Sequence, residues 1–143
     1  MFLKTHSPTD RLKIWRDIRQ KEYLSPETLI EEFTDIKILP RYLDYYTPSS
    51  WPTPFEIISE GYLCQTGVTI LLTATLINKG FITSEELVFP VISNNITGDS
   101  GAVLLDESGV YNFTPGKIES WEFVKENSTI YQTHKLTKDR LSY

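Results

Sequence analysis

The sequence predicts a single-domain α+β fold, with helices in the first half of the chain and a small antiparallel sheet in the second. Two observations indicate this. Signals for helix starts are concentrated before residue 60, and strand-like runs separated by turn residues follow only after residue 86. Segregated helices and strands of this kind are typical of α+β proteins. A chain of 143 residues is long enough to bury a core of its own.

Three helices are expected to begin at a hydroxyl residue followed by proline. The side-chain oxygen caps free N–H groups of the first turn, and proline at the first helical position lacks the N–H that would stay unsatisfied. The pairs are Ser7-Pro8, Ser25-Pro26 and Thr53-Pro54. Thr53 and Glu56 also form the pattern of a capping box.

Apolar residues at helical spacing define the first two of these helices. The first is expected to run to about Lys21 and to bury Leu12, Trp15 and Ile18. The second is short and carries Leu29, Ile30 and Phe33.

A central helix is expected from about Tyr62 to Lys79, because this stretch is apolar on nearly every side. Gly80 then supplies a C-cap. Four threonines in the stretch lower its helix propensity, so a pair of buried strands is the alternative.

Strand-like runs follow at 87–92, 101–106, 110–114 and 129–136, which predicts a sheet of about four strands. Asp106 to Gly109 is expected to form a hairpin turn, with glycine where a positive φ is needed. Pro90 predicts an edge strand or a bulge, because proline cannot donate to a strand ladder. Ser120 to Glu126 is expected to form a short helix.

Composition excludes several classes of function. The net charge of −5 argues against binding driven by the phosphates of nucleic acid or by anionic lipid. One cysteine and two distant histidines, His6 and His134, predict no disulfide, no metal site and no cofactor, and they favour a reducing compartment. The longest apolar run, Val68 to Ile77, is too short to span a membrane.

Cys64 is the first candidate for chemistry, because it falls in the expected first turn of the central helix. The helix dipole there favours a thiolate. The alternative interpretation is a small, buried apolar residue without a catalytic role.

The order of a cysteine-bearing helix followed by a small antiparallel sheet resembles the papain-like and transglutaminase-like core. The matching stretches are 99–105 and 110–114, with Asn112 at the place of the residue that orients the catalytic histidine. No histidine lies between Cys64 and His134, so the general base of the family is missing. The resemblance implies a catalytically emptied version of that fold. A Cys64-dependent hydrolase or transferase, with His134 brought from a distant strand, is the alternative function.

Two segments are candidates for binding a partner. Residues 41–55, named here the aromatic strap, combine five aromatic residues with three prolines. The strap either covers the core or forms a preorganised recognition surface. Residues 94–99, named here the polar loop, are rich in turn residues, and loops carry function more often than cores do. The candidate binding residues are Tyr42, Tyr45, Tyr46, Trp51, Asn94, Asn95 and Asp99.

The chain also resembles small accessory (early-type) proteins of T-even-like bacteriophages. The resemblance covers residues 38–116, and its specific part is Trp51-Pro-Thr-Pro-Phe-Glu-Ile57 followed by Glu60-Gly-Tyr62. It implies an intracellular product made in the infected bacterium, dispensable for the virion structure and without an assigned activity. The preferred hypothesis is a non-enzymatic accessory protein that binds a host or phage protein in the bacterial cytoplasm through the strap and the polar loop. The resemblance supplies no catalytic residues. A minor virion protein is a further alternative.

Overall fold

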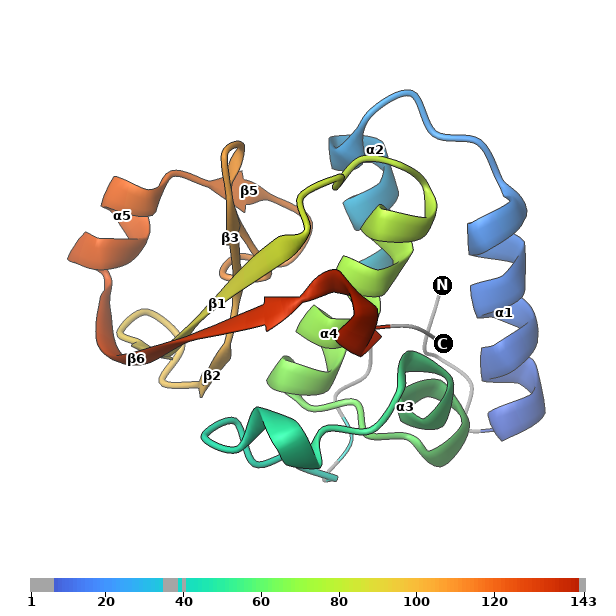
Figure 1. Cartoon of the computed structure of the whole chain (residues 1–143), viewed down its shortest axis with the longest axis horizontal. Coiled ribbons are helices and arrows are strands. Elements are labelled where there is room, and N and C mark those ends of the chain that lie inside the picture. Colours follow the sequence, from blue (N-terminus) through green and yellow to red (C-terminus); the bar gives the residue numbers. More distant parts are fainter. Residues whose placement is uncertain (1–6, 35–38, 40, 142–143) are drawn as a thin grey trace.

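The computed structural model describes residues 7–34, 39 and 41–141, and it has the α+β architecture that the sequence predicts. In Figure 1 the helices α1 (Pro8–Gln20), α2 (Pro26–Ile30) and α3 (Pro54–Glu60) lie on one side of the central helix α4 (Gln65–Asn78), and the strands lie on the other. Helix α5 (Trp121–Glu126) covers the far end of the sheet. Three short 3₁₀ helices complete the helical part: η1 (Glu31–Phe33), η2 (Pro48–Ser50) and η3 (Lys138–Leu141).

The helix starts follow the local signals of the sequence. Ser7, Ser25 and Thr53 each accept a hydrogen bond from a first-turn N–H, and Thr53 forms its capping box with Glu56. Ser120 caps α5 in the same way. The predicted helix starts are thus confirmed. They could be predicted because each cap and its partner lie only three residues apart.

Helix α4 is buried on almost every side, from Thr66 to Leu76, so the alternative of two buried strands is wrong. The threonines are compatible with the helix because their hydroxyl groups are satisfied inside it. Thr73 donates to Thr69 C=O and Thr75 to Leu71 C=O, both at 2.7 Å, which is the i−4 bond that buried threonine makes in helices.

The sheet has the order β6-β1-β2/β3-β4-β5 and is antiparallel throughout. Its strands are β1 (Glu86–Asn94), β2 (Ser100–Ala102), β3 (Leu104–Asp106), β4 (Gly109–Tyr111), β5 (Ile118–Glu119) and β6 (Ser128–Thr137). Strand β5 is absent from the predicted set of about four, because two residues leave no alternating pattern to read. The expected hairpin at 106–109 is confirmed, and Gly109 has φ 131°.

Pro90 lies in β1, and it accounts for the division of the neighbouring run 101–106 into two strands. The expected edge position is wrong, because β1 is paired on both sides, with β6 and with β2 and β3. The expected bulge is present as a register shift between Val91 and Ile92. The pairs Val91 with Ala102 and Val88 with Leu105 place Val103 opposite Pro90. Val103 N–H donates to Pro90 C=O at 3.0 Å, but proline has no N–H to return, and the run predicted at 101–106 divides there into β2 and β3.

The middle of the sheet is buried on both faces, whereas β6 is largely exposed. Val91, Ala102 and Leu104 face the main core around α4, and Trp15 of α1 reaches that core from the opposite side, where its Nε1 donates to Thr75. Ile92, Val103 and Val110 point the other way and form a second cluster with Val124 of α5. The alternation of strand side chains therefore connects α5 to the same sheet that α4 covers.

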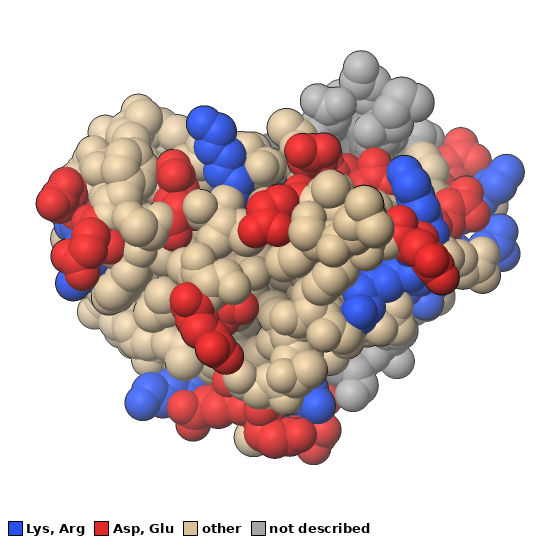
Figure 2. Space-filling model, turned by 90° about the horizontal axis from the view of Figure 1, so that it is seen from above, with Lys and Arg blue, Asp and Glu red and all other residues tan. Residues whose placement is uncertain are grey.

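The charged side chains are distributed without a dominant patch on the face in Figure 2, where acidic and basic groups lie interspersed with uncharged surface. In the described ranges no helix is both long enough and apolar enough to cross a membrane.

Candidate functional site

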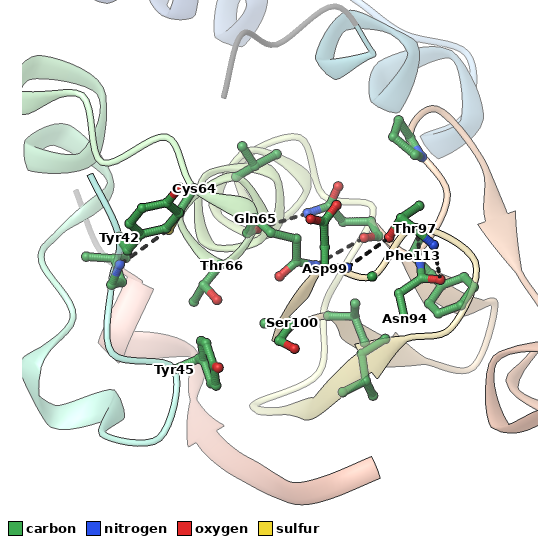
Figure 3. A pocket seen from close by; sticks show the side chains of 18 of the residues that line it. Tyr42, Tyr45, Cys64, Gln65, Thr66, Asn94, Thr97, Asp99, Ser100 and Phe113 are labelled. Atoms are coloured by element: carbon green, nitrogen blue, oxygen red, sulfur yellow. Dashed lines mark hydrogen bonds between the residues drawn. The ribbon is translucent and has the colours of Figure 1, made fainter. Parts of the chain in front are cut away.

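A pocket of about 720 Å³ lies where the aromatic strap, the start of α4 and the polar loop meet. Tyr42 and Tyr45 line it from the strap, Cys64 and Gln65 from α4, and Asp99 from the loop. Figure 3 shows the two tyrosines on one side of the pocket and Asn94, Thr97 and Phe113 on the other. Its volume falls within the range of pockets that bind small molecules.

Cys64 is the N-cap of α4, one position before its first residue Gln65, so the expected place inside the first turn is wrong by one position. Its Sγ accepts hydrogen bonds from Gly67 N–H at 3.3 Å and from Leu43 N–H at 3.4 Å. The residue is 4% exposed. The sulfur thus joins the strap to the helix start, as the interpretation of a buried, structural cysteine expects.

Asn112 contacts the same end of α4. Its backbone has φ 68°, a left-handed conformation that asparagine tolerates better than most residues. Its Nδ2 donates to Gln65 C=O at 3.1 Å and to Thr69 Oγ1 at 2.8 Å, and Gln65 Nε2 donates back to Asn112 C=O at 3.2 Å. The amide of Asn112 is thereby fixed on the helix.

Gln65 and Gly101 fit each other closely in the pocket. The Oε1 atom of Gln65 is buried and has no hydrogen-bond donor in the described part of the chain. A Cβ at position 101 would overlap that oxygen and crowd Thr66 Oγ1, so a larger residue there would require these side chains to shift. Thr66 continues the contact, since its Oγ1 accepts from Ala102 N–H at 3.1 Å.

The polar loop is held by the side chain of Asn94. Its Oδ1 accepts from Ile96 N–H at 2.9 Å and from Thr97 N–H at 3.3 Å, and its Nδ2 donates to Phe113 C=O. Asn94 is buried as a result, whereas Asn95 is exposed and lies outside the pocket lining. Asp99 is exposed, and within the described residues its carboxylate has no hydrogen bond or ion pair.

The aromatic strap covers the core through Trp51 and leaves two tyrosines on the surface. Trp51 is 8% exposed, its Nε1 donates to Asp44 C=O at 2.8 Å, and its ring packs edge-on against Phe89 of β1. This burial removes Trp51 from the candidate recognition surface. Tyr42, at 74% exposed, and Tyr46, at 49%, remain on the surface, but of these two only Tyr42 lines the pocket.

His134 is held by the strap and is not part of the pocket lining. Its Nε2 lies 2.7 Å from Tyr45 C=O, and its ring packs edge-on against Trp51. The structure therefore brings Cys64 and Asn112 to one pocket and leaves His134 outside it. None of the described residues that line the pocket is a histidine.

Asp44 supports the strap from the surface. Its Oδ2 accepts from Thr47 Oγ1 at 2.7 Å and its Oδ1 from Tyr46 N–H at 2.9 Å. The hydrogen bond from Thr47, and next the one from Tyr46 N–H, lower the pKa of Asp44 below its ordinary value.

Several pocket residues were not singled out from the sequence. Gln65, Thr66, Thr97 and Ser100 all line it. Gln65 carried one usable signal, because it is a polar residue with a long side chain at the start of an otherwise apolar helix.

No protein-family model, curated protein or solved structure matches the chain. In the part of the chain that the structure describes, no three His, Cys, Asp or Glu side chains are grouped to hold a metal ion.

Proposed function

We propose that the protein is a non-enzymatic bacteriophage accessory protein that binds a host or phage protein in the cytoplasm of the infected cell through this pocket. The observation that supports it is the meeting of the strap and the polar loop around one cavity, with the exposed Tyr42 at its rim. Large aromatic side chains beside a preformed cavity are typical of the residues that dominate binding energies at protein interfaces.

The pocket favours binding over catalysis. The Cys64 sulfur already accepts two backbone hydrogen bonds, and the imidazole of His134 is committed to the strap. A catalytic cysteine of the papain type is activated by an imidazole base, which the described lining does not supply. The phage origin and the cytoplasmic location rest on the sequence resemblance alone.

Affinity capture from infected bacteria, read by quantitative mass spectrometry, tests the proposal. The baits are the wild-type protein, Tyr42→Ala and the matched control Phe55→Ala. Phe55 is also exposed, at 51%, but lies on α3 outside the pocket lining. A partner should be recovered by the wild type and by Phe55→Ala, and about tenfold less by Tyr42→Ala. Equal recovery by all three baits, or no specific protein on any, contradicts the proposal.

Mass spectrometry of purified phage particles separates this proposal from a minor virion protein. The proposal expects the chain in lysates of infected cells and not in the particles. A fixed number of copies per particle would favour the virion alternative.

A further inference from the structure

We propose that the pocket selects a cationic group rich in hydrogen-bond donors, an ammonium or guanidinium presented by a basic side chain of the partner. This inference rests on the proposed function, because the basic side chain would belong to the partner protein. The positive charge of the ligand is inferred from the chemistry of the pocket lining.

The first step is the charge of the lining. Among the described residues that form it, Asp99 is the one acidic side chain, and no lysine or arginine accompanies it. The Asp99 carboxylate has no protein partner there to neutralise it. A phosphate or carboxylate ligand would meet only like charge, whereas a cation would gain a charge-assisted hydrogen bond.

The second step is the surplus of acceptors. Asn112 Nδ2 uses both of its N–H donors within the protein, and Gln65 Nε2 donates to Asn112 C=O. The amide oxygens of these two residues accept no such bond: Gln65 Oε1 has no donor, and no bond is made to Asn112 Oδ1 in the described structure. Gln65 Oε1 is buried, so the acceptors that the pocket can offer to a ligand are Asn112 Oδ1 and the Asp99 carboxylate, which suit a group that carries only N–H donors.

The third step is the shape of the opening. Figure 3 places Tyr42 and Tyr45 across the pocket from the loop that carries Asp99. Tyr42 is largely exposed, and aromatic walls accept both the aliphatic stem of a lysine or arginine and its charged end. A volume of about 720 Å³ admits such a side chain with its backbone at the rim.

Titration of the ¹⁵N-labelled protein by NMR tests this directly. The probes are N-acetyl-lysine N-methylamide, N-acetyl-arginine N-methylamide, and the norleucine and glutamate analogues as uncharged and anionic counterparts. Saturable shifts are expected for the side-chain amides of Gln65 and Asn112 and for the Asp99 amide, with a Kd on the order of 1 mM. The lysine and arginine probes should produce them, and their relative affinity distinguishes ammonium from guanidinium.

Asp99→Asn is the matched variant, and Glu107→Gln is its control. Glu107 is an exposed acid in the β3–β4 turn and does not line the pocket. Asp99→Asn should weaken the cationic probes about tenfold or more, and Glu107→Gln should not. Equal binding of the norleucine probe, unchanged affinity in Asp99→Asn, or no shifts at about 50 mM of either cation would overturn the inference.

The outcome is independent of the capture experiment. If the cationic probes bind but no partner is recovered, the cation site stands and the protein-binding function fails. If a partner is recovered equally by wild-type and Asp99→Asn baits and the probes do not bind, the protein-binding function stands and the cation site fails.

Discussion

At the scale of single residues, Cys64 combines burial with two backbone donors on its sulfur. A thiol in this position is protected from reagents by the strap that covers it. We expect the folded protein to react slowly with a thiol reagent such as DTNB at neutral pH, and the protein in urea to release one equivalent quickly. Fast, stoichiometric labelling of the folded protein at pH 6 would mark a reactive thiolate and contradict the structural role.

Trp51 and Tyr46 belong to the same strap but differ in burial, which makes them a matched pair. Trp51→Ala should lower the free energy of unfolding by about 3–5 kcal/mol, because the ring packs on Phe89 and its Nε1 bonds to Asp44 C=O. Tyr46→Phe keeps an exposed ring and should leave the urea midpoint unchanged. A Trp51→Ala protein with wild-type stability would show that the strap packs loosely on the core.

At the scale of elements, the threonines of α4 have two different roles. Thr73 and Thr75 are both buried and both bond to the carbonyl four residues earlier. Thr75 Oγ1 also accepts a bond from Trp15 Nε1 at 3.1 Å, which ties α1 to α4.

Replacement of each threonine by valine keeps the shape and removes the hydroxyl. Thr75→Val should cost about 1–3 kcal/mol of stability, because it removes the buried Oγ1 that accepts a hydrogen bond from Trp15 Nε1. Thr73→Val should change stability by less than about 1 kcal/mol, since a helix carbonyl keeps its backbone donor. Urea unfolding checks both, and a larger loss for Thr73→Val than for Thr75→Val would contradict the assigned roles.

The elements that sequence reasoning located are those whose signals are local. Ser7, Ser25 and Thr53 have their partners within one helical turn, and the Asp106–Gly109 turn contains its own glycine. The two-residue strand β5 and the break opposite Pro90 depend on pairing with residues elsewhere in the chain. No pattern within either segment contains that information.

The same distinction explains the pocket. Tyr42, Cys64 and Asp99 were each chosen from local composition, but their meeting depends on how β1 pairs with β2 and how the strap crosses the helix start. The position of His134 depends on the β1–β6 register, which puts it opposite Phe89 and beneath the strap. Sequence reasoning therefore grouped the strap with the loop as one candidate surface, but it did not predict that the start of α4 joins them in a single pocket.

At the scale of the whole molecule, metal removal should have no effect on stability. The described part of the chain contains no group of three or more His, Cys, Asp or Glu side chains that could hold an ion. We expect the same melting temperature with and without EDTA. A decrease of several degrees with chelator would reveal a structural metal, since metal binding contributes directly to folding free energy.

Stability at alkaline pH should report on Tyr111, a side chain that the core encloses almost completely. Burial, and next the negative charge of Asp106, raise the pKa of Tyr111 from its ordinary value of 10.0 to about 12. Because the folded state keeps the proton that the unfolded state loses, the contribution of Tyr111 is intact below pH 10 and is lost as the pH rises towards 12. The wild-type protein should therefore lose about 1.4 kcal/mol more per pH unit in this window than Tyr111→Phe, which keeps the ring and cannot ionise. Urea midpoints measured from pH 8 to pH 11.5 give both slopes, and parallel slopes would show that Tyr111 ionises as readily in the folded protein as in the unfolded chain.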